Sequence, residues 1–141
     1  MLDKFKQAIQ DASDLLREQV GALGDSARDN SFKIIEDWLQ IFPALELYGL
    51  EITSFALSVA INPALEVELR GEHEQFPTER LNEILQECKG STGLTSVFST
   101  IKTTYGLHRR TAASIRDPLI VKVRIRLSPE IKVYIGEPII D

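Results

Sequence analysis

The chain has 141 residues, of which 43% are apolar and 26% are charged, and its formal net charge is −5. These proportions are typical of a soluble globular domain and exclude a globally disordered chain. A chain of this length buries roughly two-thirds of its unfolded surface, which is enough for one core without staples. The single cysteine, Cys88, excludes an internal disulfide and a cysteine-rich zinc site.

Charge is unevenly distributed along the chain. Residues 1–72 carry a net charge of −7, residues 73–141 carry +2, and the segment 102–126 alone carries +6. Such asymmetry is typical of an interaction surface, or of two halves or two copies that complement each other. Because the N-terminus lacks the apolar run of a signal peptide, and residues 55–61 are too few to span a bilayer, we expect a cytoplasmic protein.

The first 24 residues are predicted to form an amphipathic helix appended to a main domain of residues 25–141. Apolar side chains recur at three- and four-residue spacing and so share one face; they include Leu2, Phe5, Ile9 and Leu16. The polar segment 24–30 is typical of a linker. The polar face of this helix has a net charge of −1, so contact with a membrane surface is only weakly supported.

A second helix is predicted to start at Asn30 or Ser31, because either side chain can cap a helix. Its apolar positions then follow a period of 3.6 residues. Pro43 is expected to bend or break it, since proline removes one backbone donor. Gly49 suits the left-handed conformation just past a helix end.

Two β-hairpins are predicted from the alternation of apolar and polar side chains. The first lies within residues 54–69 and turns at Asn62-Pro63. The second lies within residues 119–135 and turns at Ser128-Pro129. We therefore expect four strands in a mainly antiparallel sheet.

Two more helices are predicted between the hairpins. One opens at Pro77-Thr78 and closes at Gly90, and the next follows Ser91 and closes at Gly106. The fold class is therefore α+β, with helices packed on the apolar face of the sheet.

The two halves of the chain also resemble each other, which suggests an internal αββ repeat. Tyr48-Gly49-Leu50 and Tyr105-Gly106-Leu107 lie 57 positions apart, each at a predicted helix end, whereas the two hairpin turns lie 66 positions apart. The basic segment 108–117 accounts for the difference of nine. Few aligned residues are identical, so chance similarity between two hairpins is the alternative explanation.

That basic segment is the first candidate binding site. An arginine fork suits carboxylate and phosphate oxygens, so an anionic contact is predicted at His108, Arg109, Arg110 and Arg116. The alternative is a solvated loop whose arginines pair with the acidic first half of the chain.

The second candidate is the small-residue face of the first predicted strand, formed by Ser54, Ala56, Ser58 and Ala60. Four small side chains in a row allow another element to approach closely. A central strand that is covered on both sides, with the N-terminal helix as its lid, explains this pattern. A dimer seam or a groove for an apolar ligand are the alternatives.

No constellation predicts catalysis, a cofactor or a metal. Glu72-His73-Glu74 are adjacent residues, which rarely converge on one ion, and the phosphate-loop pattern is absent around Gly90. Cys88 lies near a predicted helix C-terminus, where the helix dipole disfavours a thiolate. We therefore expect a protein that is not an enzyme.

The sequence favours a binding or assembly domain that acts through protein–protein contacts and self-associates. The alternative function is a carrier that holds an apolar or amphipathic, lipid-like ligand between the sheet and the helices. The second hairpin does present a basic face, but few aromatic side chains lie among its charges and the pI is near 5.1, which argues against a nucleic-acid partner.

Overall fold

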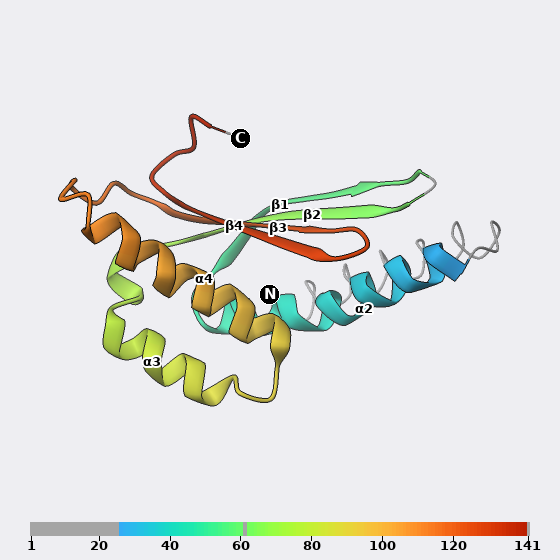
Figure 1. Cartoon of the computed structure of the whole chain (residues 1–141), viewed down its shortest axis with the longest axis horizontal. Helices are drawn as coiled ribbons and strands as arrows, with labels where there is room; N and C mark the ends of the chain where they lie inside the picture. The colour runs from blue at the N-terminus through green and yellow to red at the C-terminus, as the bar shows by residue number, and fades with distance from the viewer. Residues whose placement is uncertain (1–25, 61, 141) are drawn as a thin grey trace.

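The structure, a computed structural model, describes residues 26–60 and 62–140 (Figure 1). In chain order its elements are α2 (Ser26–Leu47), β1 (Glu51–Ser58), β2 (Ala64–Gly71), the short 3-10 helix η1 (His73–Gln75), α3 (Thr78–Glu87), α4 (Thr92–Arg109), β3 (Leu119–Ile125) and β4 (Pro129–Ile135). The α+β class is therefore confirmed. The predicted N-terminal helix, residues 1–24, lies outside the described residues.

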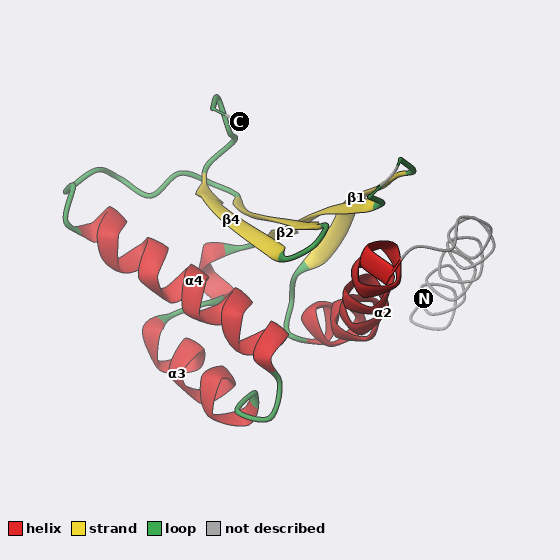
Figure 2. Cartoon of the chain, turned by 45° about the vertical axis from the view of Figure 1, so that its right-hand side comes forward, coloured by secondary structure: helices red, strands yellow, loops and turns green. Residues whose placement is uncertain are grey.

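The strands form one antiparallel sheet in the order β1-β2-β3-β4. Both predicted hairpins, β1-β2 and β3-β4, are present, and they join through the pairing of β2 with β3. The helices α2, α3 and α4 all lie on one face of this sheet, as Figures 1 and 2 show from two directions. We call that face the inner face, and the opposite one the open face.

α2 is longer than the sequence predicted. It begins at Ser26 rather than at Asn30 or Ser31, so most of the predicted linker 24–30 is helical. Ser31 is fully buried within α2, which explains why it does not act as a cap.

The predicted break at Pro43 is absent, because α2 continues through this residue to Leu47. Proline frees only one carbonyl of the preceding turn. The neighbouring Phe42 and Leu45 are 0% exposed, so their burial holds this last turn in place. Gly49, at a φ of 111°, ends the helix as predicted.

α4 begins at the predicted place and ends later than predicted. The Leu94 backbone N–H donates to Ser91 Oγ at 3.2 Å, which caps the helix. A Cβ on Gly93 would lie 2.2 Å from Ile41 Cδ1, so a larger residue here would require the Ile41 side chain of α2 to move. Gly106 does not close α4, which runs to Arg109, because buried apolar side chains outweigh the cost of a single helical glycine.

The core lies between the helices and the inner face of β2 and β3. Its largest fully buried side chains include Phe42, Phe98, Leu65, Leu69, Ile101 and Leu119. Complete burial of one such side chain contributes about 1.5–3 kcal/mol. The two central strands are therefore the part of the sheet that holds the fold together.

Candidate functional site

β1 is an edge strand without the usual protection. It pairs with β2 on one side, and no described strand lies on its other side. From Ile52 to Ala60 the chain carries no charged side chain. Edge strands normally carry charges or proline, because their unpaired N–H and C=O groups otherwise recruit other strands. A register shift lies between Ile52 and Ser54, so the regular part of this edge begins at Ser54.

The inner face of β1 is apolar and uncovered among the described residues. Phe55 pairs with the buried Val67, and Leu57 pairs with the buried Leu65, so both side chains continue the core face of the sheet. Nevertheless Phe55, Leu57 and Val59 are 39%, 38% and 49% exposed. A contiguous apolar patch of this kind marks a surface that another element covers.

The predicted seam residues lie on the other side of β1. Ser54, Ala56, Ser58 and Ala60 are all exposed. The prediction that this strand is central is therefore wrong, because β1 is at the edge of the sheet. The prediction that the N-terminal helix covers it stays a prediction. Their proposed partners on the first helix (Leu2, Phe5, Ile9 and Leu16) lie outside the described residues.

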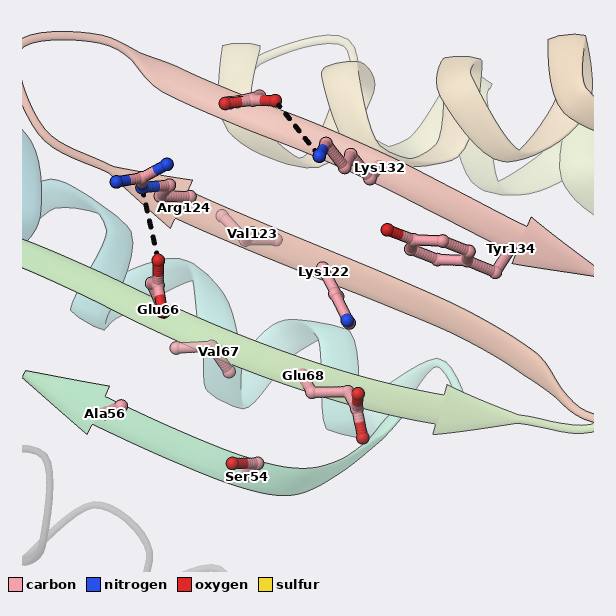
Figure 3. Close-up of a pocket in the computed structure, with 11 residues that line it drawn as sticks. Ser54, Ala56, Glu66, Val67, Glu68, Lys122, Val123, Arg124, Lys132 and Tyr134 are labelled. Carbon is pink, nitrogen blue, oxygen red and sulfur yellow. Dashed lines mark ion pairs between the residues drawn. The ribbon is translucent and has the colours of Figure 1, made fainter. Parts of the chain in front are cut away.

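A shallow hollow of about 320 Å³ occupies the open face beside these small side chains (Figure 3). One ion pair joins β3 to β2 across its floor, with Arg124 Nε 3.2 Å from Glu66 Oε1, and another lies along β4, with Lys132 Nζ 3.8 Å from Glu130 Oε1. The charged lining residues balance, with acidic Glu66, Glu68 and Glu130 against basic Lys122, Arg124 and Lys132. The hollow therefore offers no net positive surface to an anionic polymer.

The basic segment divides between a helix end and a loop. His108 and Arg109 belong to α4, whereas Arg110 and Arg116 lie in the connection that leads to β3. All three arginines are exposed, and no ion pair among the described residues involves them. The structure thus brings the four predicted residues to one end of the molecule, and their anionic contact stays a prediction.

One polar cluster was not foreseen from the sequence. His73 Nδ1 lies 2.6 Å from the Tyr105 hydroxyl, and its Nε2 lies 2.8 Å from the Arg116 carbonyl oxygen. A carbonyl can only accept, so Nε2 donates to it and the tyrosine donates to Nδ1. Burial, together with the nearby charge of Asp117, raises the pKa of Tyr105. This cluster ties the basic loop to α4.

A second polar cluster surrounds the cysteine. Cys88 is buried, and its Sγ lies 3.7 Å from the Tyr48 hydroxyl, which donates to Glu87 Oε2 at 3.0 Å. The hydrogen bond with Cys88 is the largest cause that raises the pKa of Tyr48, and burial is the next largest. The contacts in both clusters join residues 32 to 43 positions apart, so local sequence patterns carry no signal for them.

No family model, curated protein or solved structure matches this chain. Among the helices in the described ranges, none has a stretch long and apolar enough to cross a membrane. The features of the molecule that bear on its function are therefore the edge strand, the exposed patch and the basic end.

Proposed function

We propose that this chain is a non-catalytic, cytoplasmic assembly domain that self-associates through β1. The observation that carries the proposal is an edge segment, Ile52 to Ala60, without a charged side chain, in which Phe55 and Leu57 of β1 and the following Val59 remain substantially exposed. An unprotected edge supplies backbone donors and acceptors, and the exposed side chains supply apolar area. Strand addition uses both.

A second copy of the chain fits this edge best. Two copies of β1 that run antiparallel about a two-fold axis form one continuous sheet with four strands from each copy. The helices of both copies then lie on the same side of this sheet. Pairing centred on Leu57 places Phe55 of one protomer opposite Val59 of its partner. Every cross-strand pair in this arrangement is uncharged, so no like charges meet.

The strand pair alone is small for a stable interface. A specific interface buries about 1,200–2,000 Å² in total, which is more than one short strand from each copy supplies. In Figures 1 and 2 the first turn of α2 lies near the tip of the β1-β2 hairpin. α2 therefore begins next to the exposed patch, and we assign the apolar stripe predicted for residues 1–24 to the same interface.

The test is the mass of the full-length protein in light scattering over a wide range of concentration. We expect a dimer, which Leu57→Lys converts to a folded monomer because a lysine on the edge blocks strand addition. Leu47→Lys is the matched control, since Leu47 is 72% exposed but lies at the end of α2. A wild-type monomer at all concentrations, or a Leu57→Lys dimer, contradicts the proposal.

The internal αββ repeat also stays a proposal, and the strand registers support it. Adding 66 to both members of the pair Leu57↔Leu65 gives the observed pair Val123↔Ile131. The same shift relates Ser58↔Ala64 to Arg124↔Glu130. The predicted helix end at Tyr105-Gly106-Leu107 is wrong, because residues 105–107 lie inside α4. If the repeat is real, superposing the hairpins should bring α2 onto α4.

A further inference from the structure

A second hollow lies at the opposite edge of the sheet, beyond β4. The C-terminal end of α4, the end of β4 and the tail 136–140 border an open hollow of about 450 Å³. Small-molecule sites commonly occupy about 300–1,000 Å³. Half of the lining residues are aliphatic: Leu107, Val133, Ile135, Pro138, Ile139 and Ile140.

The rim of this hollow is apolar and uncovered in the described part of the chain. Ile139 is 99% exposed, Ile140 is 76% exposed and Leu107 is 57% exposed. Covering aliphatic surface stabilises a complex by about 25 cal/mol per Å². An alkyl chain laid between α4 and the tail would cover all three side chains.

The wall of the hollow also contains an unsatisfied polar atom. His108 Nδ1 is the one buried side-chain nitrogen or oxygen without a hydrogen-bond partner among the described residues. Leaving such an atom unpaired costs about 1–3 kcal/mol. The neighbouring hydroxyls of Thr104 and Thr111 already donate to carbonyls of α4, each at 2.7 Å. His108 is therefore the polar group that a ligand can satisfy.

The charges around the hollow favour a negative head group. Three arginines lie beside the hollow without lining it: Arg109 and Arg110 follow His108 directly, and Arg116 Cβ lies 3.1 Å from the position of a Cβ on the lining residue Gly136. Asp117, which follows Arg116, offsets one of these charges. The acidic lining residue, Glu137, is held by Arg70. The C-terminus of α4 contributes a partial charge of about −0.5, which three arginines outweigh.

We propose that this hollow binds a single-chain amphiphile with a carboxylate head. The alkyl chain lies along Leu107, Val133 and Ile135, and the carboxylate accepts a hydrogen bond from His108 Nδ1 within the field of the arginines. The site is at the edge opposite β1, so it goes beyond the assembly function and does not depend on it.

The test is titration of the full-length protein with monomeric decanoate, followed by calorimetry or by NMR shifts. We expect saturable binding, with decanol binding about tenfold more weakly because it lacks the charge. Joint replacement of Arg109, Arg110 and Arg116 by Ser should remove the preference for decanoate over decanol. His108→Leu, which keeps the bulk of the side chain, should weaken decanoate binding by about tenfold.

Leu127→Ser is the matched control, because Leu127 is 56% exposed but lies in the β3-β4 turn, outside the hollow. Circular dichroism establishes that each variant is folded. If the His108→Leu variant does not fold, the arginine variant still tests the head group independently. Equal binding of decanol and decanoate, unchanged binding by the arginine variant, or binding to anionic lipid vesicles without binding to monomeric decanoate overturns the proposal.

Discussion

The two edges of the sheet are built differently. β4 begins with a proline, carries Glu130 and Lys132, and packs its inner side chains Ile131, Val133 and Ile135 to intermediate exposure beneath α4. β1 is of similar length and its side chains alternate between the two faces in the same way. Its regular part nevertheless carries no charge, and its inner side chains are exposed. Both strands obey the same hairpin rules, so pairing within the fold does not explain the difference.

The fold itself protects the β4 edge of the sheet and leaves the β1 edge unprotected. Proline and charge at an edge prevent strand addition, and β4 has both. β1 has neither, and its apolar face lacks a cover among the described residues. The proposed self-association through β1 accounts for this difference, because an edge that pairs with a partner needs no such protection.

The largest expected effect separates the two strands of one hairpin, at positions on the same inner face. Leu69→Ala in β2 should lower the free energy of unfolding by about 2–5 kcal/mol, because Leu69 is 0% exposed and its loss leaves a cavity. Leu57→Ala in β1 should cost about 1 kcal/mol or less under conditions where the protein is monomeric. Urea titrations at one low protein concentration measure both, and equal losses would show that β1 is already part of the core.

The next effect comes from removing the protection of β4. Joint replacement of Glu130 and Lys132 by Thr removes both charges from this edge and keeps its β-propensity. If charge is what distinguishes the edges, this variant should associate beyond the dimer, and light scattering should detect larger species. A mass identical to that of the wild-type protein would show that α4 and Pro129 protect β4 without the charges.

Much of this architecture could be predicted because it depends on local periodicity. Alternation placed both hairpins, and the Asn62-Pro63 and Ser128-Pro129 turns are where the chain reverses. Strand order could not be read in the same way, because alternation shows which face a side chain occupies and not which neighbour the strand has. β1 was therefore wrongly placed at the centre of the sheet.

The helix ends and the polar clusters could not be predicted from the sequence for a different reason. Pro43 and Gly106 are local signals for an interruption, but tertiary burial of Phe42, Leu45 and Tyr105 overrides them. The contact of His73 with Tyr105 joins positions 32 apart. Such contacts depend on the packing of η1 against α4, which no local pattern encodes.

A smaller effect concerns the side of the molecule that β4 closes. Tyr105 is protonated more tightly in the folded state than at its ordinary pKa of 10.0. Its contribution is therefore fully present below pH 10 and is lost as the pH rises above that value, since the unfolded chain releases this proton first. Tyr105→Phe should cost about 1 kcal/mol at neutral pH and flatten the alkaline loss of stability, with Tyr48 accounting for the remainder. Unfolding curves from pH 8 upward measure both; an unchanged alkaline slope would contradict it.

The smallest effect concerns the tail that follows β4. Glu137 pairs with Arg70 through two contacts, Nη1 to Oε1 at 2.8 Å and Nη2 to Oε2 at 3.2 Å, and this ties residues 136–140 back to β2. Both side chains are substantially exposed, so Glu137→Gln should change the free energy of unfolding by about 1 kcal/mol or less. Local effects should be clearer, because the released tail no longer lies beside β4. Amide hydrogen exchange should therefore accelerate at residues 134–140 and remain unchanged in β1, and acceleration at both edges would mean that the ion pair stabilises the whole sheet.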